Sequence, residues 1–224
     1  MIIRAGQNSA EAATVTIPSG HQAGDLLIIF AFRDGSATNP TIPAGWTNIT
    51  NTLDTTSGSA SVGWKIAALS SETSGTWTNA TGLMVVVLRS IDDSAPIMTN
   101  GTSNGVSTTI TYAALTDANL RGATGYYLLA FAAHRSIDTA IDAPPTRMAN
   151  ILSALGATQD MAAHAIETGT DNWASTNVSV GGTSSGWVSI VLAIRPARLK
   201  LNNYQHPSVA SSNAGIVSVT EKTR

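Results

Sequence analysis

The stretch Leu26-Leu27-Ile28-Ile29-Phe30-Ala31-Phe32 decides the fold class of this 224-residue chain. Gly24-Asp25 precede it and Arg33-Asp34-Gly35 follow it, so turn-forming residues bound a short apolar run. A run of this length between turn signals is typical of a β-strand that is buried on both faces. We therefore expect a protein in which this strand is covered on both sides.

Further strand patterns recur outward from this run, and most of the chain follows them. Three more apolar runs lie at residues 83–88, 126–133 and 187–194. Four alternating segments lie at residues 14–17, 46–50, 59–68 and 108–112. Ser and Thr account for 53 residues, and charged residues make up only 12% of the chain, where about 25% is usual. This composition favours an all-β protein. Residues 147–155 and 160–167 contain Ala and Met and could instead be short helices.

A weak internal repeat, with a spacing near 100 residues, organises these segments. Residues 24–33 resemble residues 125–135, because each stretch starts with Gly and continues as an apolar run that ends at Arg. Neither copy alone can bury its apolar face, so the two copies should pair. We predict an antiparallel, jelly-roll-like β-sandwich over residues 12–196, with repeats near 12–92 and 107–196. One shared sandwich is preferred, although two adjacent sandwiches remain open.

Outside the sandwich we expect an N-terminal segment at residues 1–11 and an extended C-terminal arm at residues 197–224. Residues 1–196 contain eight Lys and Arg residues and 13 Asp and Glu residues. The arm contains four Lys and Arg residues and a single Glu. So few basic residues argue against nucleic-acid binding. The arm's candidate docking residues are its apolar ones: Leu199, Leu201, Tyr204, Ile216, Val217 and Val219. They could dock on the arm's own domain or on a neighbouring copy.

Catalytic and metal-binding patterns are weak in this sequence. The chain has no cysteine, and its four histidines, His21, His134, His164 and His206, do not have the spacing of metal ligands. The loop carboxylates Asp92, Asp93, Asp138 and Asp142 could bind calcium or serve a glycosidase, but loop Asp residues usually cap turns. We expect no catalytic residues, no metal and no cofactor. The longest apolar runs, of seven to nine residues, are too short to span a bilayer.

The five tryptophans are the most informative side chains. Trp64 and Trp187 lie inside strand patterns, which favours core packing. Trp46, Trp77 and Trp173 lie near loops and are therefore the candidate contacts for a glycan or a partner, with core or rim packing as the alternative.

Several segments, taken together, resemble a β-sandwich module of tailed-bacteriophage virions. They are Ala23-Gly24-Asp25-Leu26-Leu27-Ile28, Ile42-Pro43-Ala44-Gly45-Trp46-Thr47, Gly63-Trp64-Lys65-Ile66-Ala67 and Val86-Val87-Leu88-Arg89-Ser90-Ile91-Asp92. Residues 194–196, Ile-Arg-Pro, match the end of the module's second half. The resemblance covers residues 12–196 and departs most at Thr146-Arg147, where the module would have Gly-Trp.

The resemblance implies a structural virion protein, because such modules are found in decoration, fibre and tail proteins. It implies assembly into the virion in the host cytoplasm, with other capsid or tail proteins and further copies of the chain as partners in a homo-oligomer. The alternative is a head- or tail-fibre module that binds a receptor or a host surface glycan. Neither reading requires an enzyme, and a hydrolase on the same sandwich is the third and weakest possibility.

Overall fold

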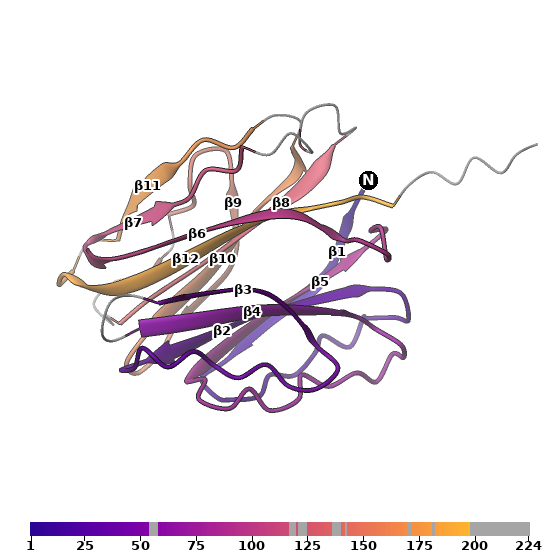
Figure 1. Ribbon diagram of the computed structural model, residues 1–224, viewed down its shortest axis with the longest axis horizontal. Coiled ribbons are helices and arrows are strands. Elements are labelled where there is room, and N and C mark those ends of the chain that lie inside the picture. The colour runs from indigo at the N-terminus through magenta and orange to yellow at the C-terminus, as the bar shows by residue number, and fades with distance from the viewer. Residues whose placement is uncertain are drawn as a thin grey trace, which may run out of the picture.

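The computed structural model describes residues 1–53, 58–116, 120, 125–135, 140–141, 143–169, 172–180 and 182–197. In these ranges the chain forms two five-stranded antiparallel sheets and a small two-stranded sheet. The two large sheets lie face to face, as Figure 1 shows. The chain is therefore all-β, as the sequence predicts. No helix in the described ranges is both long and apolar enough to cross a membrane.

Each large sheet is built from one half of the chain. The first sheet has the order β1-β5-β2-β4-β3. Its strands are β1 (Ile3–Ala10), β2 (Leu26–Asp34), β3 (Thr47–Leu53), β4 (Gly58–Ile66) and β5 (Gly82–Arg89). The second sheet has the order β6-β12-β8-β10-β9. Its strands are β6 (Ile97–Ser107), β8 (Tyr126–His134), β9 (Ala149–Leu155), β10 (Asp160–Gly169) and β12 (Ser185–Ile194). The second sheet thus has the same order as the first when β6, β8, β9, β10 and β12 are matched to β1–β5.

Equivalent positions of the two halves meet across the sandwich. The rings of Phe30 and Phe131 stack with centroids 5.2 Å apart and planes 3° apart. Arg135 Nε donates to Asp34 Oδ1 at 2.5 Å. In both pairs the partners are 101 residues apart in the chain. The central strands β2 and β8 therefore lie opposite each other with matched positions in contact.

The central strands are buried on both faces, as the long apolar runs predict. On β2, Ile28, Phe30 and Phe32 pack in the core between the sheets. The alternate residues Leu27, Ile29 and Ala31 pack in a second core on the outer face. Because successive side chains of a strand point to opposite faces, a strand covered on both faces is expected to have mostly apolar residues, with any buried polar side chain hydrogen-bonded.

Layers of irregular chain and the small two-stranded sheet cover these outer faces. Over the first sheet, Val15, Ile17, Trp46, Ala67 and Trp77 complete the outer core. Over the second sheet lies the pair β7 (Thr109–Tyr112) and β11 (Thr176–Ser179), visible beyond β6 and β12 in Figure 1. The sandwich is therefore four layers thick rather than two.

Buried hydroxyls tie the covering layer to the first sheet. Ser59 Oγ, in β4, donates to the carbonyl oxygens of Ser36 and Thr38 at 3.0 and 2.9 Å. Ser61 Oγ donates to the carbonyl oxygen of Pro40 at 2.7 Å. The polar positions of β4 thus anchor the loop that leads to β3.

Several boundaries differ from those expected from the sequence. The edge strands β1 and β6 begin before the predicted repeats at 12–92 and 107–196. Residues 14–17 are extended and bury Val15 and Ile17, but they belong to the covering layer and not to a sheet. The helical alternatives at 147–155 and 160–167 are wrong, since these segments form β9 and β10. The two five-stranded sheets also lack the eight-strand arrangement of a jelly roll.

The same tight turn occurs in both halves of the chain, but different residues occupy its left-handed position. Trp46 N donates to Pro43 O, and Met148 N donates to Pro145 O. The residue before the donor has a positive φ in each case: 84° for Gly45 and 72° for Arg147. The structure therefore matches Arg147 to Gly45, one residue away from the alignment read from the sequence.

Replacing Arg147 by glycine is expected to raise the free energy of unfolding by about 1 kcal/mol. Glycine adopts this left-handed conformation without the steric cost that a side chain adds. Chemical denaturation of the two proteins measures the difference. Gly45→Ala is the reciprocal control and should lower stability, and equal stability of all three proteins would contradict this account of the turn.

The described chain ends where its two halves join. Ala197 N donates to Ser90 O at 2.9 Å, and Pro196 forms a bridge with Ile91. The predicted arm at 197–224 begins at this point. Its candidate docking residues, Leu199, Leu201, Tyr204, Ile216, Val217 and Val219, lie outside the described residues.

Candidate functional site

A groove of about 500 Å³ lies over the first sheet, between the end of β1 and two extended segments of the covering layer. Most of its lining side chains carry a hydroxyl or an amide, and Glu72 adds one carboxylate. The lining residues are Asn8, Ser9, Ala10, Thr14, Val15, Thr16, Ile17, Glu72, Thr73, Ser74, Gly75 and Thr76. Such a surface can hydrogen-bond to a hydroxylated or peptide-like ligand.

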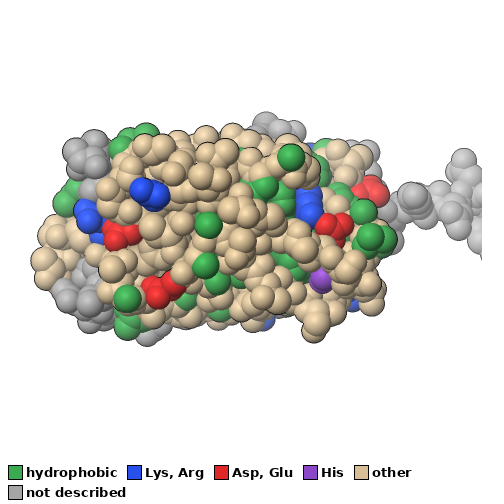
Figure 2. Space-filling model, turned by 90° about the horizontal axis from the view of Figure 1, so that it is seen from below, with side chains coloured by type: hydrophobic (Ala, Val, Ile, Leu, Met, Phe, Trp, Pro, Cys, Tyr) green, Lys and Arg blue, Asp and Glu red, His purple; other side chains and the backbone are tan. Residues whose placement is uncertain are grey.

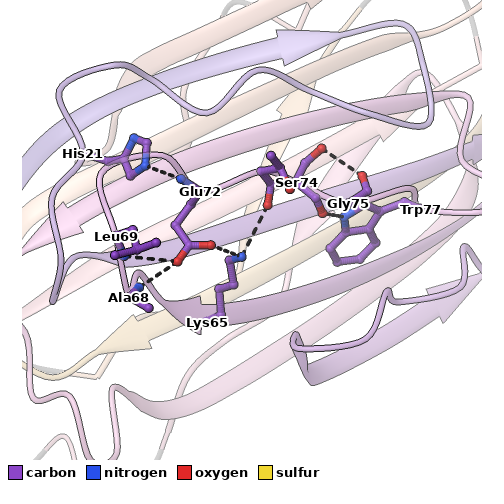
Figure 3. A network of polar contacts seen from close by, with 9 residues as sticks. His21, Lys65, Ala68, Leu69, Glu72, Ser74, Gly75 and Trp77 are labelled. Carbon is purple, nitrogen blue, oxygen red and sulfur yellow. Dashed lines mark hydrogen bonds and ion pairs between the residues drawn. The ribbon is translucent and has the colours of Figure 1, made fainter.

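Ser74 joins the two extended segments that form the groove. Its Oγ accepts from Val15 N at 3.0 Å and donates to Gly75 O at 2.9 Å. Its carbonyl oxygen accepts from Trp77 Nε1 at 3.1 Å. Figure 3 shows the contacts of Ser74 with Gly75 and Trp77 beside the Glu72 network. The floor of the groove is therefore held by one buried serine and one buried tryptophan.

Glu72 closes one end of the groove with its carboxylate fully engaged. It accepts from Lys65 Nζ at 2.5 Å, from Ala68 N at 2.7 Å and from Leu69 N at 3.3 Å. Lys65 Nζ also lies 5.1 Å from the ring centroid of Trp46. The hydrogen bond from Lys65 is the largest cause that lowers the pKa of Glu72. Glu72 thus stabilises the turn at 68–72 as an anion.

His21 is held by the backbone on both ring nitrogens. Its Nδ1 lies 2.7 Å from Pro18 O, and its Nε2 accepts from Glu72 N at 3.0 Å. This pair of contacts requires the neutral tautomer with the proton on Nδ1. His21 therefore fixes the Glu72 segment, and neither nitrogen is placed to take a proton from a hydroxyl in the groove.

Replacing Glu72 by glutamine is expected to lower the free energy of unfolding by about 1 kcal/mol at pH 7. Because the pKa of Glu72 in the folded protein lies below its ordinary value of 4.5, the carboxylate contributes stability above pH 4.5, and this contribution is lost as the pH falls through the folded pKa. The difference between wild type and E72Q should therefore shrink below pH 4.5.

Denaturation midpoints measured from pH 3 to pH 7 check this expectation. Glu11→Gln is the matched control. The Glu11 carboxylate accepts from Ala157 N and has no lysine partner among the described contacts. A stability difference for E72Q that stays constant across the whole pH range would contradict the role assigned to Glu72.

The three tryptophans singled out as glycan or partner contacts do not offer a free ring face. Trp46 is 9% exposed, Trp77 is 0% and Trp173 is 3%. Their loops fold back over the outer faces of the sheets, so the rings fill the outer cores. This corrects the expectation drawn from their position near loops and supports the alternative of core packing.

The two tryptophans expected in the core are placed accordingly. Trp187 is buried, and its Nε1 donates to Ser107 Oγ at 3.0 Å. Trp64 is half-buried and packs against the core between the sheets. The prediction from their strand positions is confirmed for Trp187 and holds in part for Trp64.

A second polar cluster lies on the outer face of the second sheet. His134, Asp160 and His164 are almost fully buried there, and Asp160 Oδ2 lies 3.9 Å from His134 Nε2. Asp160 also accepts from Ile141 N. Burial, and secondly the charge of Asp160, raise the pKa of Tyr112 above its usual range, so this phenol stays neutral.

This polar cluster does not form a metal site. Within the described ranges, no three His, Asp or Glu side chains come together as metal ligands. Asp92 Oδ1 accepts from Ser94 N and Ser94 Oγ, which is the turn-capping role that loop aspartates usually have. Asp93 is exposed, whereas Asp138 and Asp142 lie outside the described residues.

The sequence reasoning missed the groove itself. Its hydroxyl-bearing residues belong to segments that had no strong pattern of their own, apart from the alternation at residues 14–17. The one signal was the apolar outer face of β2, which requires a covering layer. No family model, no curated protein and no solved structure matches the chain.

Proposed function

We propose that this chain is a non-enzymatic structural protein of a phage virion, which decorates or cements the particle through its β-sandwich and a docking arm. The observation that carries the proposal is the coverage of the sandwich. Both outer faces of the large sheets already lie under their own covering layers. Partner contacts are left to the sheet edges, the groove and the C-terminal segment.

The residues behind the phage resemblance are fold-forming ones, which fits a structural role. Asp25 is buried and accepts from Arg89 Nε and Nη2, each at 2.7 Å. Gly45 supplies the left-handed turn before the buried Trp46. The resemblance therefore describes a scaffold that could be placed in several virion parts.

The surface of the covering layer also suits close packing between subunits. Figure 2 shows the face that lies below the first sheet in Figure 1, and charged side chains are few and scattered on it. Charged residues make up 12% of the whole chain. Many copies can be packed side by side at little electrostatic cost when few like charges meet.

Light scattering on the purified full-length chain and on a variant ending at residue 197 tests this proposal. We expect an oligomer for the full chain and a monomer for the truncated one, because the arm would hold neighbouring subunits. Circular dichroism of the truncated variant checks that the sandwich remains folded. A monomeric full-length chain would contradict self-assembly through the arm.

The second candidate is a fibre module that binds a receptor or a host glycan, and the hydroxyl-lined groove favours it. A glycan array read up to about millimolar ligand tests this candidate, since weak lectins respond in that range. Thr16→Val removes one hydroxyl from the lining at nearly constant volume, and Thr50→Val, away from the groove, is its control. An array without hits would exclude glycan binding of this strength.

A further inference from the structure

The edge strand β6 has features that invite pairing with another strand. It contains eleven residues, of which none is charged and none is proline. In its sheet it pairs with β12 alone, so its other edge carries no strand within the described residues. Edge strands are usually protected by charges, prolines or bulges. The register with β12 is regular from Ser107 to Thr99 and shifts only at Ile97.

On the opposite side of the sandwich, the edge strand β9 also has no charged residue, but the neighbouring edge strand β1 is protected. There the edge strand β1 carries Arg4 and a bulge between Arg4 and Gly6. Glu11, just beyond β1, accepts from Ala157 N at 2.7 Å and ties this side to the end of β9. A charge, a bulge and a bridging contact all discourage a further strand on that side.

Two exposed apolar side chains lie near the ends of the edge strands β3 and β6. β3, the edge strand of the first sheet, lies beside β6 and also has no charged residue. Leu53 at the end of β3 is 41% exposed, and Val106 near the end of β6 is 60% exposed. A strand added here would gain backbone hydrogen bonds and cover apolar surface at the same time.

The C-terminal residues 215–221 have the pattern that such a strand needs. The sequence Gly-Ile-Val-Ser-Val-Thr-Glu is rich in β-branched residues, and Val217 and Val219 would share one face. Lys222 and Arg224 follow directly. An antiparallel orientation brings these two cations to the start of β6, beside the exposed Asp93.

We propose that residues 215–221 of one copy add an antiparallel strand to the free edge of β6 in a neighbouring copy. This inference rests on the proposed function and names the surface that receives the arm. Residues 198–214 would be the linker, and 17 residues reach up to about 56 Å when extended. That length is sufficient to leave Ala197 and reach an adjacent subunit.

Disulfide trapping tests the proposal cleanly, because the chain has no cysteine of its own. Full-length T102C is mixed with full-length V217C, and in a second mixture with S218C, so that either face of the added strand is sampled. After mild oxidation we expect a covalent heterodimer in at least one mixture, with the linked peptides identified by mass spectrometry. The N150C variant on edge strand β9 is the matched control, and it should give at least about tenfold less heterodimer.

Other outcomes overturn the proposal. A cross-link formed only within one chain, in the T102C/V217C or T102C/S218C double variant and not in the mixtures, would mean that the arm folds on its own domain. A T102C–T102C dimer that persists without residues 198–224 would mean that β6 pairs with a second β6. Equal cross-linking to the N150C control would mean that the contact is not specific.

A charged substitution on the edge strand β6 tests the same proposal by a second measurement, the strength of self-association. Asn104 is exposed in β6, so Asn104→Lys should leave the thermal unfolding midpoint unchanged while it weakens self-association at least about tenfold. Asn150→Lys on β9 is the control and should have no such effect. If truncation at residue 197 dissolves the oligomer but N104K and trapping at β6 have no effect, the assembly proposal stands and this docking site is wrong.

Discussion

Replacing Phe30 by alanine is expected to lower the free energy of unfolding by about 3–5 kcal/mol, a large part of the roughly 5–15 kcal/mol that holds a typical domain folded. Phe30 is fully buried and stacks on Phe131 at the centre of the sandwich. The substitution removes apolar contact with the opposite sheet and leaves a cavity between two rigid layers. Urea denaturation of wild type and F30A measures the loss.

The stacking itself can be separated from burial by a double-mutant cycle. Phe30→Leu and Phe131→Leu each keep an apolar side chain, so the variant proteins stay folded. The coupling free energy between the two substitutions should be about 0.5–1.5 kcal/mol. The control cycle combines Phe30→Leu with Trp77→Phe. Trp77 lies in the outer core on the other face of the first sheet, so these two changes should add within about 0.5 kcal/mol. A coupling near zero between Phe30 and Phe131 would contradict direct packing of the two halves.

The sequence predicts the central strands well, because strands covered on both faces have apolar residues at most positions. The four long apolar runs became β2, β5, β8 and β12, each close to its expected bounds. β10 was ambiguous since its inward residues include Ala163 and Ala165, and alanine is also common in helices. Its assignment as a strand follows from tertiary pairing with β8 and β9.

The edge strands and the covering layers were harder to predict. β1 and β6 have one side open, so their residues need not be apolar, and they carry little pattern. The position of the three tryptophans near loops leaves contact with a partner and packing in the core both open, because loops usually lie at the surface. A strand that is apolar on both faces already implies a cover, and Trp46, Trp77 and Trp173 are the large side chains that supply it. Combining these two facts favours core packing over contact with a partner.

The covering layer of the first sheet depends most on Trp77, and Trp77→Ala is expected to lower the free energy of unfolding by about 3–5 kcal/mol. The ring is fully buried, and its Nε1 holds Ser74 in the floor of the groove. Trp64→Ala is the comparison on the other face of the same sheet. It should cost less, because Trp64 is only half-buried. Limited proteolysis within residues 67–81 should become faster in W77A than in W64A, as the covering layer opens locally.

A reciprocal substitution tests the contact beneath Trp77. Gly63 lies directly under the ring, and a Cβ at this position would come within 2.9 Å of Trp77 Cη2 and 3.2 Å of Thr47 O. Gly63→Ala should therefore cost about 1–3 kcal/mol by overpacking. In the Trp77→Phe background the ring no longer reaches this point, so the same Gly63→Ala change should cost measurably less. If the two costs are equal, the clash arises from the β3 backbone at Thr47, and the close approach of Trp77 to β4 is not what requires glycine there.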